Sequence, residues 1–151
     1  MTMNKNISLG KIFPRSFRLM VMTLVAMLLI SLLMSSSSHK TTIFIIGDST
    51  AAEKGNYRNY PERGWGMVFQ GCFDDQIIVD NHAVNGRSSK SFLDEGRWQK
   101  ILDKMQPGDY VIIQFGHNDE KKFPNRYTIP GGTFDAHLAK YVNETRQKGG
   151  I

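Results

Sequence analysis

The chain has 151 residues, of which 40% are hydrophobic and 22% are charged, and this balance excludes a disordered or collagen-like protein. Its length predicts at most one domain. Residues 1–38 hold four of the nineteen basic residues and none of the fourteen acidic ones, so most of the net charge of +5 belongs to the N-terminus. The rest of the chain is nearly neutral, which removes the main argument for a nucleic-acid partner. A single cysteine, Cys72, excludes an internal disulfide.

The N-terminal segment predicts export from the cytoplasm. A basic stretch ends at Arg18, and the uncharged, mostly aliphatic run of residues 19–34 follows it, ahead of four serines at 35–38. We therefore expect residues 1–38 to be a signal peptide cleaved near Ser38, with a periplasmic or extracellular mature protein. A membrane span needs roughly 17–20 apolar residues, so an uncleaved signal anchor is the alternative, and only then would the membrane be a partner.

Three strands are predicted from short runs rich in β-branched residues. The runs are 42–46, 76–80 and 110–115. Each is almost continuously apolar, which favours strands that are covered on both faces of a sheet. Helical segments are expected between these strands, at residues 64–69, around Phe92 and at 97–105.

A longer helix is predicted after the third strand. Thr133 is its expected N-cap, Asp135 suits its positive end, and Gly149-Gly150 would end it. Its apolar face is expected to hold Leu138, Tyr141, Val142 and Thr145. The alternation of strands and helices predicts an α/β fold with a parallel sheet and right-handed crossovers. A fourth strand is expected where the sequence stops at Ile151, so residues 39–151 are predicted to be the N-terminal part of a larger domain.

Polar residues follow each predicted strand, at the edge where parallel sheets bind ligands. After the first strand comes Gly47-Asp48-Ser49-Thr50, in which a serine on a strand-to-helix turn is a candidate nucleophile. Thr50 and Glu53 have the spacing of a capping box, so a helix cap is the alternative interpretation of this turn.

The second and third strands are followed by similar candidates. In the stretch 81–89, Gly86 permits a close approach of the backbone to a ligand, or simply a loop with a positive φ. In Gly116-His117-Asn118-Asp119, the asparagine amide can donate to an oxyanion and the histidine can move a proton. A turn whose polar side chains satisfy local backbone groups is the alternative.

Taken together, these three clusters resemble the SGNH (GDSL-type) hydrolase superfamily. Gly47-Asp48-Ser49, Gly86 and the stretch 116–119 match its first three blocks in chain order. Three longer stretches are most similar to the rhamnogalacturonan acetylesterase subgroup: 80–89, 114–121 and 126–132. The resemblance covers residues 42–151 and implies a three-layer αβα fold with a flavodoxin-like parallel sheet, truncated after the third strand and its following helix.

The resemblance also implies roles for individual residues. Ser49 would be the nucleophile, and the oxyanion hole would consist of the backbone N–H groups of Ser49 and Gly86 and the side-chain amide of Asn118. Four further residues would support the site, the two aspartates by holding the loops: Asp48, Gly116, His117 and Asp119. No cofactor is expected, and no metal either, because His82 and His137 lack partners at zinc-ligand spacing.

One departure from the superfamily concerns the base. The resemblance implies a last block of Asp-x-x-His, and no such block occurs in these 151 residues, since Asp135-Ala-His137 has a different spacing. A serine hydroxyl without a base is a weak nucleophile, so the chain as given is expected to be inactive or nearly so.

The expected function is that of an exported serine esterase that removes acetyl groups from a pectic or related cell-wall polysaccharide. A GDSL lipase or thioesterase is the alternative among enzymes. A glycan-binding protein or pseudo-enzyme fragment without catalysis is the alternative from another class.

Overall fold

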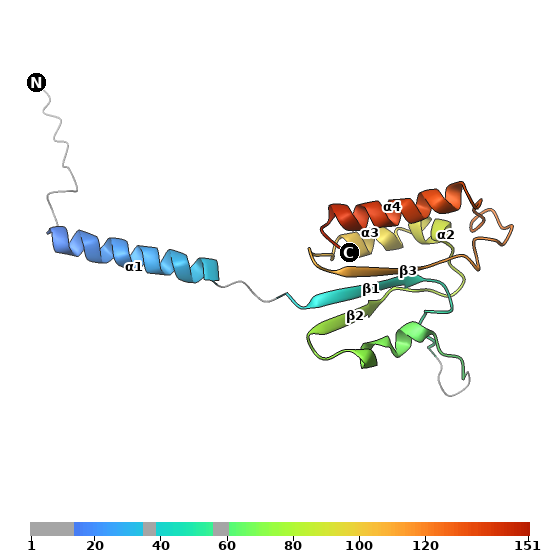
Figure 1. Cartoon of the computed structure of the whole chain (residues 1–151), viewed down its shortest axis with the longest axis horizontal. Helices are drawn as coiled ribbons and strands as arrows, with labels where there is room; N and C mark the ends of the chain where they lie inside the picture. Colours follow the sequence, from blue (N-terminus) through green and yellow to red (C-terminus); the bar gives the residue numbers. More distant parts are fainter. Residues whose placement is uncertain (1–13, 35–38, 56–60) are drawn as a thin grey trace, which may run out of the picture. The chain divides into compact units, whose positions relative to one another are not determined.

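The computed structural model describes residues 14–34, 39–55 and 61–151, which fall into two units, Met1–His39 and Lys40–Ile151. In the first unit the helix α1 (Arg15–Met34) includes the predicted apolar run (Figure 1). Within the described ranges, no helix combines the length and the apolar character needed to cross a membrane. The predicted cleavage region, Ser35–Ser38, lies outside the described residues.

The second unit is built on a parallel sheet of three strands in the order β2-β1-β3. The strands are β1 (Thr41–Gly47), β2 (Ile77–Asn81) and β3 (Tyr110–Gln114). Each lies within one or two residues of its predicted run, which confirms the α/β fold with a parallel sheet. At the outer edge of β3, Ile151 N donates to Asp109 O (2.9 Å) and Val111 N donates to Ile151 O (3.0 Å), the bonding pattern of a parallel neighbour.

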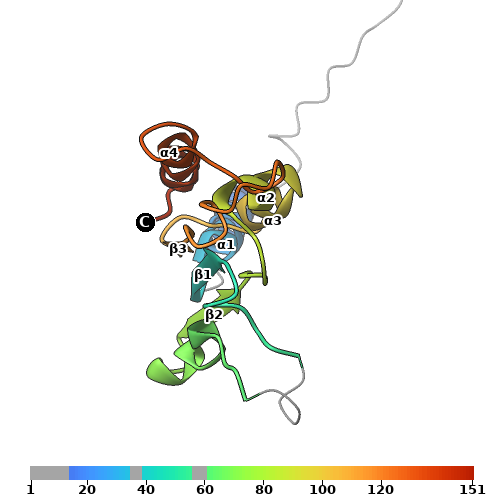
Figure 2. The same cartoon turned by 90° about the vertical axis from the view of Figure 1, so that its right-hand side faces the viewer.

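Three helices cover one face of this sheet: α2 (Ser89–Asp94), α3 (Arg97–Leu102) and α4 (Thr133–Gln147). They lie together on one side of the strands in Figures 1 and 2. Phe44 and Ile46 of β1 pack there against Phe92, Trp98 and Tyr141, all buried. Because successive side chains of a strand point to opposite faces, Ile45 is left for the other side.

The second face of the sheet is covered by two 3₁₀ turns, η2 (Trp65–Met67) and η3 (Phe69–Cys72). The α-helix predicted at residues 64–69 is therefore replaced by tighter turns. Trp65 N donates to Thr50 O (2.9 Å), and a Cβ at Gly64 would lie only 2.1 Å from Ala52 O. The backbone of this segment thus bonds to the turn after β1 and packs directly on it, which competes with the continuation of a helix.

The last helix begins where the sequence predicts, but its cap differs. Gly132 is the N-cap of α4, and Thr133 is the first helical residue, so the prediction of a Thr133 cap is wrong. The Thr133 hydroxyl accepts instead from Ile129 N (2.8 Å), because the preceding loop folds back onto the first turn. At the other end Gly149 has φ +79°, which confirms the predicted helix end at the glycine pair.

Candidate active site

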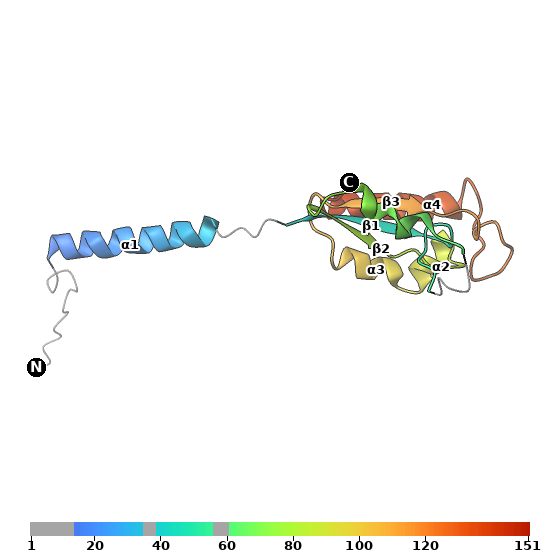
Figure 3. The same cartoon turned by 90° about the horizontal axis from the view of Figure 1, so that it is seen from below.

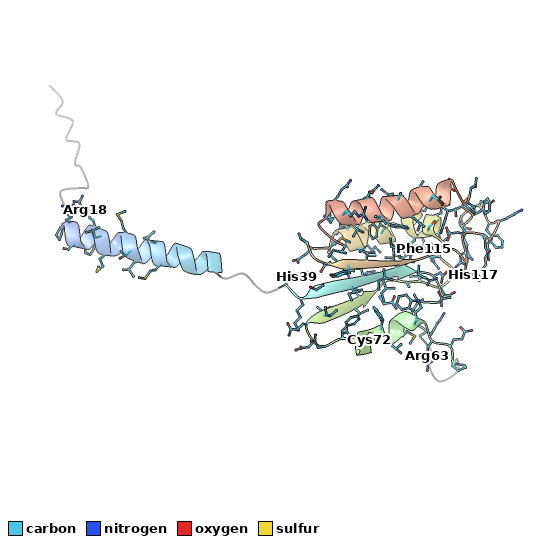
Figure 4. All side chains as sticks on the ribbon, viewed as in Figure 1. Arg18, His39, Arg63, Cys72, Phe115 and His117 are labelled. Atoms are coloured by element: carbon cyan, nitrogen blue, oxygen red, sulfur yellow. The ribbon has the colours of Figure 1, made fainter. Side chains whose placement is uncertain are left out.

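The polar clusters that follow the three strands meet at one edge of the sheet. Gly47 pairs with Gln114 in the ladder, and Val84 N donates to Gly47 O (3.0 Å), which extends the alignment of the second strand. In Figure 3 the loop after β3 and α2 lie at this same end, and Figure 4 labels His117 there. A Cβ at Gly47 would lie 2.7 Å from Gln114 O, so a glycine is required at this crossing point.

The turn after β1 is held by the buried carboxylate of Asp48. Its Oδ1 accepts from Thr50 N (2.9 Å), Thr50 Oγ1 (2.7 Å) and Gln114 Nε2 (3.2 Å). The described residues up to 55 form turns and bends here, so the expected strand-to-helix turn and the capping box of Thr50 with Glu53 are both wrong. An aspartate that bonds the backbone two residues ahead forms a turn that competes with a helix, and Gln114 of β3 bonds the same oxygen.

Ser49 lies half-buried in this turn, and within the described structure its Oγ makes no hydrogen bond. Its backbone carbonyl accepts from Lys54 Nζ (2.7 Å), and the same ammonium donates to Asn85 Oδ1 (2.9 Å). Lys54 therefore ties the first cluster to the residue before Gly86. The sequence analysis missed Lys54, because no local pattern indicates a contact across 31 residues.

Gly86 has φ +75°, in the left-handed region that favours glycine, so the turn at this position depends on it. The neighbouring backbone is fixed from the third cluster, since Asn118 Nδ2 donates to Arg87 O (3.1 Å) and Asn118 Oδ1 accepts from Lys121 Nζ (3.2 Å). The Asn118 side chain is buried and oriented by these two bonds. An amide has two N–H groups, so one further donor of Asn118 is available for an oxyanion.

Asp119 joins the third cluster to the start of α2. Its carboxylate accepts from Ser89 N (3.0 Å), Ser89 Oγ (2.5 Å) and Thr128 Oγ1 (3.0 Å), and its Oδ2 accepts from Gly116 N (3.1 Å). The residue is 4% exposed, so these bonds are shielded from water. They hold the loop that carries Asn118 against the helix that follows the second cluster.

Three described histidines contact polar side chains other than that of Ser49. His117 is 60% exposed, with Nδ1 3.6 Å from Glu120 Oε1. His137 Nδ1 lies 3.1 Å from Ser89 Oγ, and His82 Nε2 lies 3.0 Å from Asp80 Oδ2. Among the described residues, no three His, Cys, Asp or Glu side chains gather as a metal-binding group.

Charge pairs beside the site leave their acidic members ionised. Burial raises the pKa of Asp80, but the hydrogen bond and charge of His82, together with Lys104, outweigh it and lower the pKa below its ordinary value. Burial also raises the pKa of Glu95, but the hydrogen bonds and charges of Arg97 and Arg87 outweigh it and lower that pKa below its ordinary value. Both arginines are therefore already paired with a carboxylate.

A parallel α/β sheet with a serine, a positive-φ glycine and an asparagine amide at its carboxyl edge has the layout of an ester hydrolase. Residues 45–151 match the GDSL-like Lipase/Acylhydrolase family, and the chain belongs to this family. The resemblance predicted from the three clusters is confirmed.

The chain is similar to two proteins that are named as rhamnogalacturonan acetylesterases. The chain is 43% identical over 108 residues to the probable rhamnogalacturonan acetylesterase YesY of Bacillus subtilis (strain 168), covering 71% of this chain and 49% of that protein. It is 42% identical over 107 residues to the rhamnogalacturonan acetylesterase RhgT of the same organism, covering 71% of this chain and 44% of that one. The chain thus spans about half the length of the curated relatives it matches.

The fold is similar to that of a protein of known crystal structure. The crystal structure of the Bacillus subtilis protein YxiM superposes with a TM-score of 0.61 at 26% sequence identity, covering 74% of this chain and 31% of that chain. This likeness confirms the predicted fold class.

Proposed function

We propose that the protein is a serine esterase that removes acetyl groups from a pectic polysaccharide. The observation that carries the proposal is the convergence of Ser49, Gly86 and Asn118 at one edge of the sheet, joined through Lys54 and through the bond from Asn118 to Arg87 O. The names of YesY and RhgT support rhamnogalacturonan as the polysaccharide.

The proposed reaction has two steps. Ser49 Oγ attacks the carbonyl carbon of the acetyl ester, and the N–H groups of Ser49, Gly86 and the Asn118 amide donate to the oxygen that gains negative charge. The C–O bond to the sugar then breaks, the sugar hydroxyl leaves with a proton, and the acetyl group stays on Ser49. Water hydrolyses this acyl-enzyme, which releases acetate and restores the hydroxyl. The proton that Ser49 loses is the one that the leaving sugar oxygen gains, so the first step balances.

Acetate release from acetylated rhamnogalacturonan by the complete gene product tests the proposal. Ser49→Ala should abolish this release while thermal melting stays unchanged. Ser91→Ala is the matched control, because its hydroxyl bonds only within the capping box of α2 with Ser88. Wild-type release by Ser49→Ala protein would overturn the proposal.

The same assay separates the alternatives. Faster hydrolysis of long-chain acyl esters than of acetyl esters would indicate a lipase or thioesterase. Binding of the acetylated glycan with no acetate release would indicate a glycan-binding protein.

We also propose that the protein is exported and cleaved near Ser38. The basic flank and the apolar run of residues 19–34 support this proposal. Mass spectrometry of the periplasmic or secreted protein should find a new N-terminus close to Ser38. Recovery of intact Met1 in the membrane fraction would instead establish a signal anchor.

A further inference from the structure

Arg126, in the loop between β3 and α4, packs directly over Gly86. A Cβ placed on Gly86 would lie 3.6 Å from Arg126 Nη2 and 3.7 Å from both Cζ and Nη1. The whole plane of the guanidinium therefore lies against the glycine whose N–H is a proposed oxyanion donor. The proposed function assigns no role to Arg126.

The guanidinium is held in place without an anion. Arg126 N donates to Phe123 O (2.9 Å), and the guanidinium carbon lies 5.8 Å from the centroid of the Phe123 ring. Among the described residues, its guanidinium N–H groups form no hydrogen bond and no ion pair. Arg126 is half-buried, and a charge that is partly removed from water without a partner costs free energy.

Two other arginines near this edge differ from Arg126. Arg87 Nε lies 3.1 Å from Glu95 Oε2, and Arg97 Nε lies 2.5 Å from the same oxygen. Both guanidinium groups therefore share a carboxylate partner within the protein, whereas that of Arg126 has none among the described residues.

Nearby carboxylates do not serve as its partner. Asp48 accepts through Oδ1 from Thr50 and Gln114 and has its Oδ2 buried, and Asp119 accepts from Ser89, Thr128 and Gly116. Two further side chains that contact the site are cationic, since Lys54 bonds Ser49 O and Lys121 bonds Asn118 Oδ1. The edge of the sheet around Gly86 thus favours a negatively charged ligand.

We propose that Arg126 binds the carboxylate of an acidic sugar unit of the polysaccharide, and so is a specificity-determining residue for the proposed reaction. The inference rests on the proposed function. The planar guanidinium offers paired N–H donors that match the two oxygens of a carboxylate. A carboxylate bound there would place its sugar chain beside Gly86.

Binding of a matched pair of ligands tests this role. The probes are an acetylated galacturonic acid-containing oligosaccharide and the same oligosaccharide with its carboxylates methyl-esterified. Affinity is measured by titration calorimetry on the complete gene product with Ser49→Ala, so that no ligand is consumed. The acidic form should bind about tenfold to a hundredfold more tightly than the ester, as expected for a hydrogen-bonded charge pair.

Arg126→Gln should abolish this preference, and Arg126→Lys should retain part of it because the charge remains without the planar fork. Arg97→Gln is the control, since it removes one positive charge that is paired with Glu95. An acid preference that persists in Arg126→Gln would overturn the proposal. Equal weakening of both ligands would also overturn it, because Arg126 would then support Gly86 rather than read the carboxylate.

Acetate release by the protein with Ser49 intact distinguishes failure of the Arg126 proposal from failure of the proposed esterase function. Release without an acid preference in the binding assay would overturn the role of Arg126 alone. Absence of both release and binding would overturn the proposed function as well.

Discussion

Two buried aspartates flank β3 at opposite ends, and they have the same chemistry but different surroundings. Asp109, just before the strand, accepts from Thr42 N (2.8 Å) and Gln106 N (2.8 Å). Asp119, beyond the other end, accepts from Ser89 at the start of α2 and from Gly116 and Thr128 in the loop after β3. Each carboxylate stabilises the backbone near the beginning or the end of a strand by accepting these hydrogen bonds.

The difference lies in what each aspartate holds in place. Asp109 fixes the start of β1 and a turn, at the amino edge of the sheet. Asp119 fixes the loop that carries Asn118, at the carboxyl edge, where loops diverge and leave room for a ligand. Hydrogen bonds to a buried aspartate therefore stabilise only the fold at the amino edge. At the carboxyl edge they stabilise both the fold and the candidate active site.

The strongest test of this contrast is Ser49→Ala at the carboxyl edge. If the chemistry resides there, the substitution in the complete gene product should lower acetate release by as much as ~10⁶-fold, as for a lost nucleophile in a triad enzyme. The melting temperature should stay within a degree or two, since the hydroxyl makes no hydrogen bond with the described residues. Initial rates and thermal melts on the same samples measure both quantities.

Asn118→Ala should have a graded effect at the same edge. Removal of one oxyanion donor lowers kcat by about 10²–10³-fold, while KM changes little, because the donor acts mainly on the transition state. Steady-state kinetics with an acetyl ester give both constants. An unchanged kcat in folded Asn118→Ala protein would exclude the amide from the oxyanion hole.

Alanine substitutions of Asp109 and Asp119 test whether the two carboxylates have these different roles. Asp119→Ala and Asp109→Ala should each lower the free energy of unfolding by about 2–5 kcal/mol, since buried N–H donors lose their acceptor. Only Asp119→Ala should also reduce kcat of the folded fraction, through displacement of Asn118. Urea unfolding beside activity per folded molecule tests this, and equal loss of kcat in both variants would contradict the contrast.

The smallest expected effect is a pH dependence at Asp80, near the carboxyl end of β2. Its pKa is lowered in the folded state, so its contribution to stability is complete above the unfolded value of 3.8 and is lost as pH falls through the folded value. The side chain is 34% exposed, so this contribution is about 1 kcal/mol or less. Asp80→Asn should melt below the wild type at pH 6, and the difference should shrink towards about pH 3.

Local patterns predicted the strands well and the turns less well. Residues 42–46 and 110–115 lie in strands almost to the residue, because a continuous β-branched run is unstable unless both faces are buried. The capping box at Thr50 and Glu53 had an equally plausible local pattern, yet Asp48 and Gln114 determine that turn instead. Competing hydrogen bonds from a neighbouring strand are invisible to a pattern of four residues.

The sequence by itself determined the three strands, the polar clusters that follow them and the family to which they belong, since each depends on residues adjacent in the chain. Only the tertiary structure decided how these clusters are held and what surrounds them. Lys54 meets Asn85 across 31 residues, and Ser89 meets Asp119 across 30. The contact of Arg126 with Gly86 is similarly remote in sequence. Such contacts arise because parallel strands need long crossovers, which bring their carboxyl ends together at one edge.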